Sequence, residues 1–432
     1  MTIAKKLVNF NAYIQYKKLQ SNQPKNAEAL KAIQFNKLKR LLSFSYSNFE
    51  FYRELMDNAR FDPEKFHDLE EISLLPVITK NDYREFTEHQ LKKHPEKYAQ
   101  YFKDHTSGST GIPLVVYRTW SERAYLLSKF LRVFFNNGYS IFDTTFGILA
   151  PTRYSGRDSI LQKLGIMPRV QAQFSDPAEK LARMFHDSKA DVLYGNVSSL
   201  VQMALHMEKK GMAVKPLKFY LTTGEELDEN SAKTIERVFG ENLINHYGSI
   251  ELSTMAYRKK GEKYFNFCHD TNLLEILDQN GQASETGSNI VTDFHIYSFP
   301  MVRYELGDQL ETAREDGFPM IKRIKGRKDA SVVMKDGSKE PAYFLFEIFG
   351  KDLLVRQYKV VQEAWDLFKA ELVISDLNEK ENLSKKIIAR FEHYMGAEVR
   401  LEINFVDEIA PEASGKIAKF FSKVPENRAS DR

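Results

Sequence analysis

The stretch from residue 105 to residue 113 is dense in small and hydroxyl-bearing side chains, the kind that can surround a phosphate group. Its central residues are Ser107, Gly108, Ser109, Thr110 and Gly111. Glycine lets the backbone approach an oxyanion closely, and hydroxyl and N–H groups donate hydrogen bonds to its oxygens. The stretch lacks the Gly-Lys-Ser/Thr ending of a Walker A loop, which excludes that class of phosphate loop. Ordinary turns use the same residue types, so this stretch alone leaves a phosphate loop and a plain turn both open.

Polar clusters recur downstream, and two of them stand directly after predicted strands. Residues 223–226 (Thr-Gly-Glu-Glu) follow one apolar run, and residues 247–251 (Tyr-Gly-Ser-Ile-Glu) follow another. Later clusters occupy residues 303–308, 326–330 and 414–416. The carboxyl ends of parallel strands lie at one edge of an open α/β sheet, where such sheets bind ligands. The spacing therefore favours a ligand site at this edge.

Each cluster also has a structural explanation when it is taken singly. Asp308 follows a glycine, as turn residues do. Glu251 could stabilise a helix N-terminus, and Tyr247 could belong to the core. Lys416 follows a glycine near the end of the chain, where a lysine is usually solvated. The order of the clusters along the chain is therefore more informative than any one of them.

The segments between the clusters predict the elements that would position them. Apolar runs predict strands at residues 114–117, 145–149, 192–194, 219–222 and 243–246. Helical periodicity predicts helices at residues 122–136, 178–188, 197–210 and 229–239. This alternation predicts an α/β fold with a mainly parallel sheet. Beyond residue 270 the pattern changes to antiparallel strands, predicted at residues 273–277, 289–293 and 317–324.

The two ends of the chain differ from its middle. Residues 1–60 have the periodicity of helices. The last 100 or so residues read as a small α+β module, with helices at residues 344–350 and 380–395 and strands at residues 351–362, 366–374 and 398–406. We therefore expect a large N-terminal domain over residues 1–328, with a helical start at 1–60, and a small C-terminal domain over residues 329–432.

Bulk composition excludes several classes of protein. The 432 residues, 42% hydrophobic and 28% charged, are typical of a soluble globular protein too long for one core. A net charge of +3 argues against a nucleic-acid partner. The single cysteine, Cys268, excludes an intramolecular disulfide and fits the cytoplasm. No apolar run reaches the roughly 18 residues of a transmembrane helix.

Positive charge is concentrated at the N-terminus. The first 40 residues contain nine Lys or Arg and one acid, Glu28. A solvated helix face is the favoured interpretation of this excess. Peripheral contact of residues 1–40 with an anionic membrane surface is the alternative.

The ordered set of clusters resembles the adenylate-forming superfamily, and within it the phenylacetate–CoA ligase and CapK-like branch. The resemblance begins with the pairs Phe51-Tyr52, Leu75-Pro76 and Thr79-Lys80 and extends to Lys416. It implies a large domain of mainly parallel sheets plus an antiparallel part, followed by a small mobile α+β domain. It also implies ATP-dependent activation of an aryl or acyl carboxylic acid to an acyl-adenylate. The products would be pyrophosphate and AMP, and the acceptor would be CoA, a carrier-protein thiol or an amine.

The resemblance assigns nucleotide contacts to four of the clusters. Residues 107–111 would form a flexible loop around the β- and γ-phosphates. The ring of Tyr247 would stack on the adenine, with Gly248 and Ser249 in the same loop. The adenine would also be lined by Gly224, Glu225 and Glu226. Carried over in the same way, Asp308 would accept hydrogen bonds from the ribose hydroxyls.

The remaining assignments concern the metal, the hinge and the catalytic charge. Glu251 would hold Mg²⁺, and Arg327 would contact the nucleotide near the domain junction. Asp329 would be the hinge, and Lys416 would reach the α-phosphate and the acyl carboxylate. A carboxylate that attacks a phosphate brings two anions together, so a metal ion and a lysine suit the chemistry.

Departures from the family pattern bear on the metal and on the alternatives. Some relatives have a Cys/His cluster that can bind zinc, but here the corresponding region offers only His246, Cys268 and His269, so no zinc site is expected. Tyr154, Phe174 and Tyr220 are available for an acid pocket and permit an aryl or medium-chain acid. Two alternatives stay open: a non-catalytic nucleotide-binding protein on this fold, and a capsule- or polysaccharide-cluster ligase that activates an acyl or amino acid.

Overall fold

The structure, a computed structural model, describes residues 8–106, 114–150, 160–327, 330–342, 344–350, 352, 354–410 and 418–425. Contacts between Cα atoms divide the chain into two units. The first unit comprises Met1–Gly138 and Tyr247–Lys325, and the second comprises Tyr139–His246 and Gly326–Arg432. The expected domain boundary between residues 328 and 329 remains a prediction. No helix of the described segments is long and apolar enough to cross a membrane.

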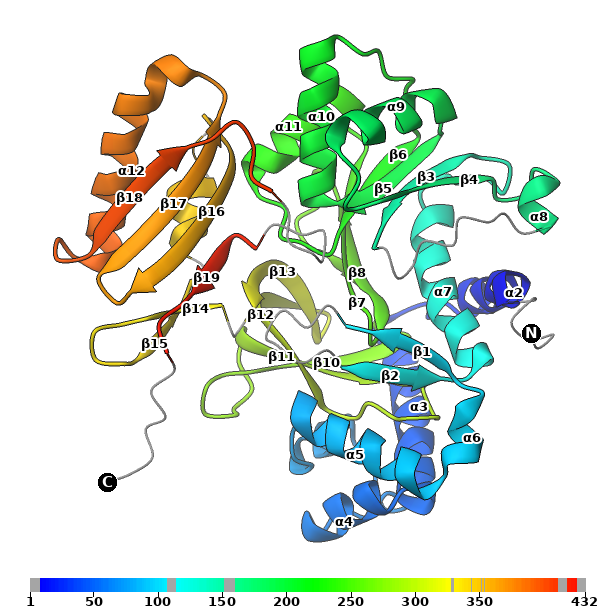
Figure 1. The fold of residues 1–432 in the computed structure, drawn as a ribbon. Helices are drawn as coiled ribbons and strands as arrows, with labels where there is room; N and C mark the ends of the chain where they lie inside the picture. Colours follow the sequence, from blue (N-terminus) through cyan, green and yellow to red (C-terminus); the bar gives the residue numbers. More distant parts are fainter. Residues whose placement is uncertain are drawn as a thin grey trace. The chain divides into compact units, whose positions relative to one another are not determined.

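The first unit begins with helices, as the N-terminal periodicity predicts. They are α2 (Val8–Ser21), α3 (Ala27–Asn48), α4 (Glu50–Asn58), η1 (Leu69–Leu74), α5 (Lys80–Lys93) and α6 (Pro95–Ala99). The strands β1 (Phe102–His105) and β2 (Val115–Arg118) pair antiparallel and lead into α7 (Trp120–Phe135). Helix α2 lies alongside α7 (Figure 1) and buries Ala12, Tyr16 and Leu19.

Helix α7 starts where Thr119 and Glu122 form a capping box. The second carboxylate oxygen of Glu122 accepts hydrogen bonds from the backbone N–H groups of Tyr297 and Ser298, both at 2.8 Å. A capping box satisfies two backbone donors that a helix start leaves unpaired. Glu122 therefore fixes the start of α7 and also ties it to a distant part of the chain.

An antiparallel sheet completes the first unit. Its strand order is β10 (Asn272–Leu277), β11 (Thr286–Asp293), β12 (Tyr304–Glu315) and β13 (Phe318–Arg327). Strand β8 (Ser253–Lys259) pairs antiparallel with β9 (Asn266–Phe267). One hydrophobic core joins these strands to the N-terminal helices, with Tyr52, Leu252, Val291 and Phe299 all fully buried.

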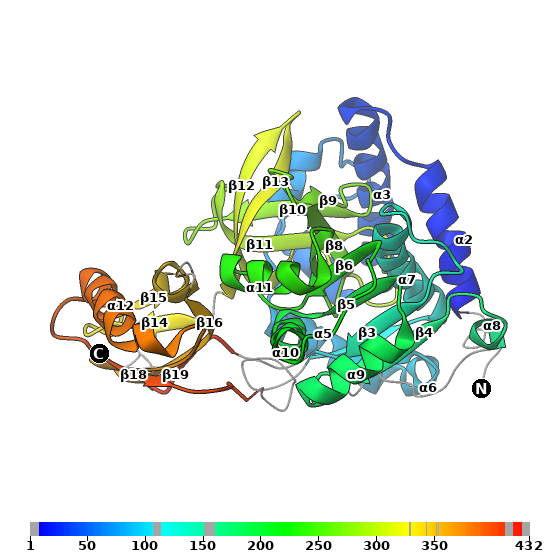
Figure 2. The same ribbon diagram turned by 90° about the horizontal axis from the view of Figure 1, so that it is seen from above.

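The second unit contains the parallel sheet that the alternating pattern predicts. Its strands lie in the order β4 (Arg169–Gln173), β3 (Thr145–Leu149), β5 (Val192–Asn196), β6 (Phe219–Thr223) and β7 (Leu243–Ser249), and the last three residues of β7 are counted with the first unit. The paired strands from β4 to β7 are parallel. The helices α8 (Ile160–Lys163), α9 (Ala178–Ser188), α10 (Val197–Lys210) and α11 (Glu229–Phe239) connect the strands, and Figure 2 shows α9 and α10 lying along the sheet.

A second sheet of this unit comes from the end of the chain. The strands lie in the order β18 (Arg400–Phe405), β17 (Leu367–Ile374), β16 (Val355–Ala364) and β19 (Phe420–Ser422). Helix α12 (Lys380–Met395) covers one face of this sheet (Figure 1) and buries Leu383, Ile387 and Phe391. The hairpin of β14 (Ser331–Val333) and β15 (Lys339–Pro341), the π-helix η3 (Phe346–Gly350) and the short η4 (Leu377–Glu379) complete the module. An α/β fold is therefore confirmed, together with a C-terminal α+β module.

Candidate active site

Several predicted site residues fall on parts of the chain that the structure does not describe. They are Ser107, Gly108, Ser109, Thr110, Gly111, Asp329 and Lys416, together with Tyr154 of the expected acid pocket. Their roles remain predictions from the sequence. The other predicted residues lie in two groups, one in each unit.

In the first unit, the structure brings Tyr247 and Asp308 together across 61 positions of sequence. The Tyr247 hydroxyl donates a hydrogen bond to Oδ2 of Asp308 at 2.6 Å. The same hydroxyl accepts one from Nδ2 of Asn289, also at 2.6 Å. Tyr247 lies at the end of β7, Asp308 on β12 and Asn289 on β11. Two residues predicted to bind the adenine and the ribose are thus joined by one phenol.

Asn289 is a site residue that the sequence did not single out. Its side chain is fully buried, and its Oδ1 atom has no hydrogen-bond partner in the structure. It lies inside a predicted strand, where nothing in the local pattern distinguishes it from a core position. Buried polar atoms without partners are rare in folded proteins and call for an explanation.

Glu251 lies in the turn that follows Tyr247, Gly248 and Ser249. The turn connects β7 to β8, and Glu251 is only 8% exposed. Within the described segments, its carboxylate makes no hydrogen bond and no ion pair. Carboxylate oxygens are the protein ligands that Mg²⁺ prefers, and Mg²⁺ keeps several waters when it binds. A nearly buried carboxylate that no protein donor binds therefore fits the metal role predicted for Glu251.

Tyr52 and Ile78, which lie within or next to the residue pairs at the start of the resemblance, support the strand that carries Asp308. The Tyr52 hydroxyl donates to the carbonyl of Pro300 at 2.5 Å. Ile78 forms a parallel bridge with Tyr304, in which N–H of Ile78 donates to the Arg303 carbonyl at 2.9 Å. Tyr52 and Ile78 therefore act on the site indirectly, by holding the start of β12.

Arg303 strengthens this support. It is 4% exposed, and its guanidinium donates to the backbone carbonyls of Ser73 and Leu75 and pairs with Glu275 at 2.9 Å. Its φ of 48° lies in the left-handed region, which a non-glycine residue adopts only where its surroundings impose it. Arg303 therefore fixes the approach to β12 and does not serve as a free cation of the site.

In the second unit, the polar ends of β6 and β7 meet. The Thr223 hydroxyl and Nδ1 of His246 lie 2.9 Å apart. Burial lowers the pKa of His246 to about 4, because a charged imidazole is costly away from water. His246 is therefore neutral at physiological pH. The sequence placed it only among candidate zinc ligands, and within the described segments no group of three or more His, Cys, Asp or Glu could hold a metal.

In the cluster after β6, Gly224 forms the turn and Glu225 caps a helix. Gly224 has a φ of 77°, which glycine adopts without strain. The carboxylate of Glu225 accepts hydrogen bonds from Nδ2 of Asn196 at 2.9 Å and from N–H and Oγ of Ser198, both at 2.7 Å. Ser198 lies in the first turn of α10, where a carboxylate is favourable. The Glu225 carboxylate thus stabilises the start of α10. Its predicted contact with adenine would come from atoms of Glu225 other than the carboxylate oxygens.

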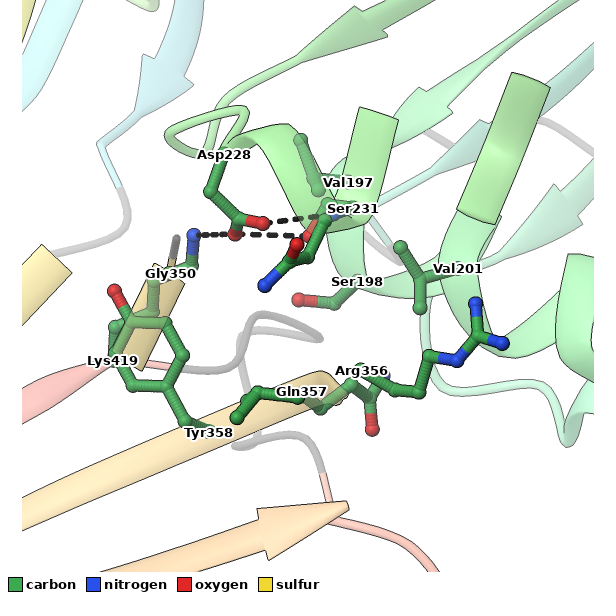
Figure 3. Close-up of a pocket in the computed structure, with 12 residues that line it drawn as sticks. Val197, Ser198, Val201, Asp228, Ser231, Gly350, Arg356, Gln357, Tyr358 and Lys419 are labelled. Atoms are coloured by element: carbon green, nitrogen blue, oxygen red, sulfur yellow. Dashed lines mark hydrogen bonds and ion pairs between the residues drawn. The ribbon is translucent and has the colours of Figure 1, made fainter. Parts of the chain in front are cut away.

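Glu226 lies beside a pocket that involves the C-terminal module of the same unit. Nζ of Lys419 donates to the Glu226 carbonyl at 3.1 Å. It also pairs with Oδ2 of Asp228 at 2.5 Å, and Figure 3 shows this ion pair. Burial lowers the pKa of Lys419, but the charges of Asp228, Tyr358 and Glu226 and the hydrogen bond to Asp228 together outweigh burial, so the pKa is raised overall. The pocket is shallow and open to solvent, with about 370 Å³ of empty space when the open solvent is included, and is also lined by Arg356, Gln357 and Tyr358.

Two further predicted residues, Tyr220 and Arg327, lie in the second unit, and the structure decides the role of Tyr220 only. Tyr220 is fully buried in the core beneath α11, and its hydroxyl donates to the Gly240 carbonyl at 2.6 Å. It was expected to be available for the acid pocket, and this expectation is wrong because its side chain points into the core. Arg327 is the last residue of β13, and its predicted contact with the nucleotide remains a prediction.

Comparison with known proteins gives one match to a family model and several relatives. Residues 333–423 match the family model described as the CapK C-terminal domain. The chain is 24% identical to Protein CapK of Staphylococcus aureus over 414 residues, which covers 89% of this chain and 87% of CapK. It is 24% identical to a phenylacetate-coenzyme A ligase of Thermus thermophilus over 306 residues, and this alignment spans 65% of each chain, just under two thirds of that enzyme.

The fold is also found in a solved structure of a CoA ligase. A 2-hydroxyisobutyryl-CoA ligase, crystallised in the postadenylation state with R3-HIB-AMP, superposes with a TM-score of 0.73. The superposition covers 93% of this chain and 91% of that ligase at 18% sequence identity, a level at which the likeness concerns the fold. The chain therefore has the fold of the adenylate-forming CoA ligases, and its sequence is similar to the phenylacetate–CoA ligase and CapK-like branch of that superfamily.

Proposed function

We propose that this chain uses ATP to convert a carboxylic acid into an acyl-adenylate and then transfers the acyl group to CoA or to another thiol or amine acceptor. The observation that carries the proposal is the pair of Tyr247 and Asp308, joined through one hydroxyl at 2.6 Å. An aromatic face and a carboxylate held side by side suit a purine and its ribose diol. The similarity to phenylacetate-coenzyme A ligases and the fold shared with a CoA ligase bound to an acyl-AMP support the same chemistry.

Mg²⁺ would be held by Glu251 and would neutralise charge on the phosphates of ATP. The protein's own contribution is to orient the acid and the nucleotide and to supply the positive charge of Lys416 in the transition state. That charge is most useful while the carboxylate attacks the α-phosphate, because two anions then approach each other. The residues of the loop at 107–111 would hold the departing pyrophosphate.

A capsule- or polysaccharide-cluster ligase is the second candidate. Its support is the CapK C-terminal match over residues 333–423 and the extensive alignment with CapK. It would share the adenylation step with the first candidate and differ in the acid and the acceptor. The non-catalytic alternative predicts nucleotide binding without turnover, so an activity assay separates it from both.

Pyrophosphate exchange tests the proposal directly. Protein, Mg²⁺, ATP and radiolabelled pyrophosphate are incubated with a panel of aryl, short-chain, medium-chain and amino acids. At least one acid should drive label into ATP, and CoA or an amine should then release AMP. Asp308→Ala should weaken ATP binding strongly, because a ribose diol would lose its acceptor. Asp187→Ala is the matched control, since the Asp187 side chain is 70% exposed on α9. Release of orthophosphate without AMP would contradict the proposal.

A further inference from the structure

The turn that carries Glu251 is held by two buried cations from elsewhere in the first unit. Three consecutive carbonyls, those of Ile250, Glu251 and Leu252, accept hydrogen bonds from Arg118 or Lys129. Turns usually lie at the surface, where water satisfies their backbone. A buried turn must find its donors within the protein. Here the donors are both charged side chains.

Arg118 reaches the turn from the end of β2. It is 2% exposed, and its Nη2 donates to the Ile250 carbonyl at 3.3 Å and to the Glu251 carbonyl. Burial lowers the pKa of Arg118, but an arginine keeps its charge in proteins. Nearby negative charges favour that charge, including those of Asp104, Glu122 and Glu251 itself. Arg118 therefore binds the backbone of Glu251 while its charge stands close to the Glu251 carboxylate.

Lys129 reaches the next carbonyl from the middle of α7. Its side chain is fully buried. Its Nζ donates to the Leu252 carbonyl at 2.8 Å and to Oδ1 of Asn272 and Oδ2 of Asp293, both at 3.1 Å. A lysine ammonium has three N–H donors, so each of them has an acceptor. Asp293 balances the charge, and Asn272 and Leu252 complete the hydrogen bonds.

The turn is fixed on its other side as well. N–H of Leu252 donates to Oγ of Ser249 at 3.0 Å, and the Ser253 hydroxyl donates to the Leu126 carbonyl of α7 at 2.8 Å. Ser253 has a φ of 57°, a conformation that a non-glycine residue keeps only where its surroundings hold it. A buried ion pair often stabilises a fold no better than apolar residues of the same size would. Its use here points to a demand for exact placement of the turn and not for stability.

We propose that Arg118 and Lys129 are positioning residues that hold the backbone of Glu251 so that its carboxylate faces the metal-binding position. The inference rests on the proposed function, because it gives Glu251 its metal role. The Glu251 carboxylate accepts no hydrogen bond from the described residues, so its direction depends on the backbone and on the nearby charge of Arg118, and Arg118 sets both. Outer groups that orient a metal ligand typically contribute about 10- to 100-fold in metal affinity.

The test uses the full-length protein with Arg118→Met, Arg118→Lys and the double variant Lys129→Met/Asp293→Asn, which avoids leaving an unpaired buried carboxylate. Arg118→Met and the double variant should raise the Mg²⁺ concentration for half-maximal pyrophosphate exchange by about 10-fold or more. The rate at saturating Mg²⁺ should change much less, and Arg118→Lys should recover part of the loss. Arg132→Met is the matched control, since Arg132 is equally buried on α7 but pairs with Asp270 and makes no hydrogen bond to the turn.

Two measurements do not depend on turnover. Hydrogen exchange of the backbone amides at residues 248–254 should increase in Arg118→Met and stay unchanged in Arg132→Met. The affinity for Mn²⁺–ATP, measured by calorimetry, should fall in Arg118→Met and not in the control. Faster amide exchange with unchanged metal dependence would reduce Arg118 to a structural residue and overturn the inference. Wild-type protein without exchange activity on any acid would overturn the proposed function instead, and Mn²⁺–ATP affinity would still decide the positioning role.

Discussion

The hydroxyl of Tyr247 offers the sharpest test of the nucleotide site, because Tyr247→Phe removes that one group and keeps the ring. In the wild-type protein the hydroxyl accepts from Nδ2 of Asn289 and donates to Asp308, each at 2.6 Å. Asn289 is fully buried, and its Oδ1 already lacks a partner. Tyr247→Phe therefore leaves the whole amide of Asn289 without a hydrogen bond. Asp308 is only partly buried, so water can replace the phenol there.

The expected loss of stability in Tyr247→Phe comes from the buried amide of Asn289. Leaving one buried polar group unpaired costs about 1–3 kcal/mol of stability. For a unit of this size that corresponds to a fall of roughly 2–12 °C in the melting temperature of the first unit. The double variant Tyr247→Phe/Asn289→Leu should recover most of it, because replacing both partners by apolar groups of similar shape is nearly neutral. Differential scanning calorimetry of the wild type and the variants measures both effects.

Nucleotide binding separates the ring from the hydroxyl. Tyr247→Phe keeps a stacking face, whereas Tyr247→Ala removes it and should weaken ATP binding by a further 1–3 kcal/mol or so, about 5- to 150-fold. Calorimetric titration with ATP and Mg²⁺ gives this ratio. A Tyr247→Phe variant as stable as the wild type would refute the reasoning about Asn289. Equal ATP affinity of the Phe and Ala variants would refute the stacking role.

Three further predictions concern the second unit and the C-terminal lysines. Lys416→Ala should abolish formation of the acyl-adenylate yet still transfer a chemically supplied acyl-AMP, and equal loss of both half-reactions would contradict the two-step account. Burial lowers the pKa of His246 to about 4, so between about pH 6.5 and pH 4 the unfolded chain binds a proton at this residue and the folded chain does not. The free energy of unfolding should therefore fall by roughly 3 kcal/mol as the pH drops through that range. Melting followed against pH should show a smaller loss in His246→Gln. Lys419→Met leaves Asp228 buried without its cation and should cost about 3–5 kcal/mol, whereas Lys423→Met, at a side chain 52% exposed on the same part of the chain, should change the melting temperature little.

The elements of the α/β core could be predicted because their patterns are local. The helices α9, α10, α11 and α12 begin and end where the periodicity predicts, and β3 does too. Each of these helices has one apolar face at helical spacing, and the strand has an apolar run of strand length. These patterns can be recognised without knowing which other segments pack against them. The order of the polar clusters was equally visible, and from it came the resemblance to adenylate-forming enzymes.

The strands that were missed carry weaker local signals. Strand β12 was not predicted, although it holds Asp308, because charged residues such as Glu305 and Glu311 interrupt its apolar positions. Strand β4 lies at the edge of its sheet and has only one fully buried residue, Ala172. Such strands are recognised by their hydrogen-bonded neighbours and not by their own composition.

The residue types of the site were determined by the sequence, and their partners by the tertiary structure. Glu225 was expected at the adenine, yet its carboxylate caps α10, 27 residues earlier in the chain. Tyr247 meets Asp308 and Asn289 only because the folding of the first unit brings three separate segments of the chain together. Nothing in the local sequence distinguishes Arg118 and Lys129 from other basic residues. Their role depends on the hydrogen bonds that they donate to the buried turn at Glu251. A hydrogen bond between residues more than 40 positions apart depends on how the sheets and helices pack, and no periodicity along the chain carries that information.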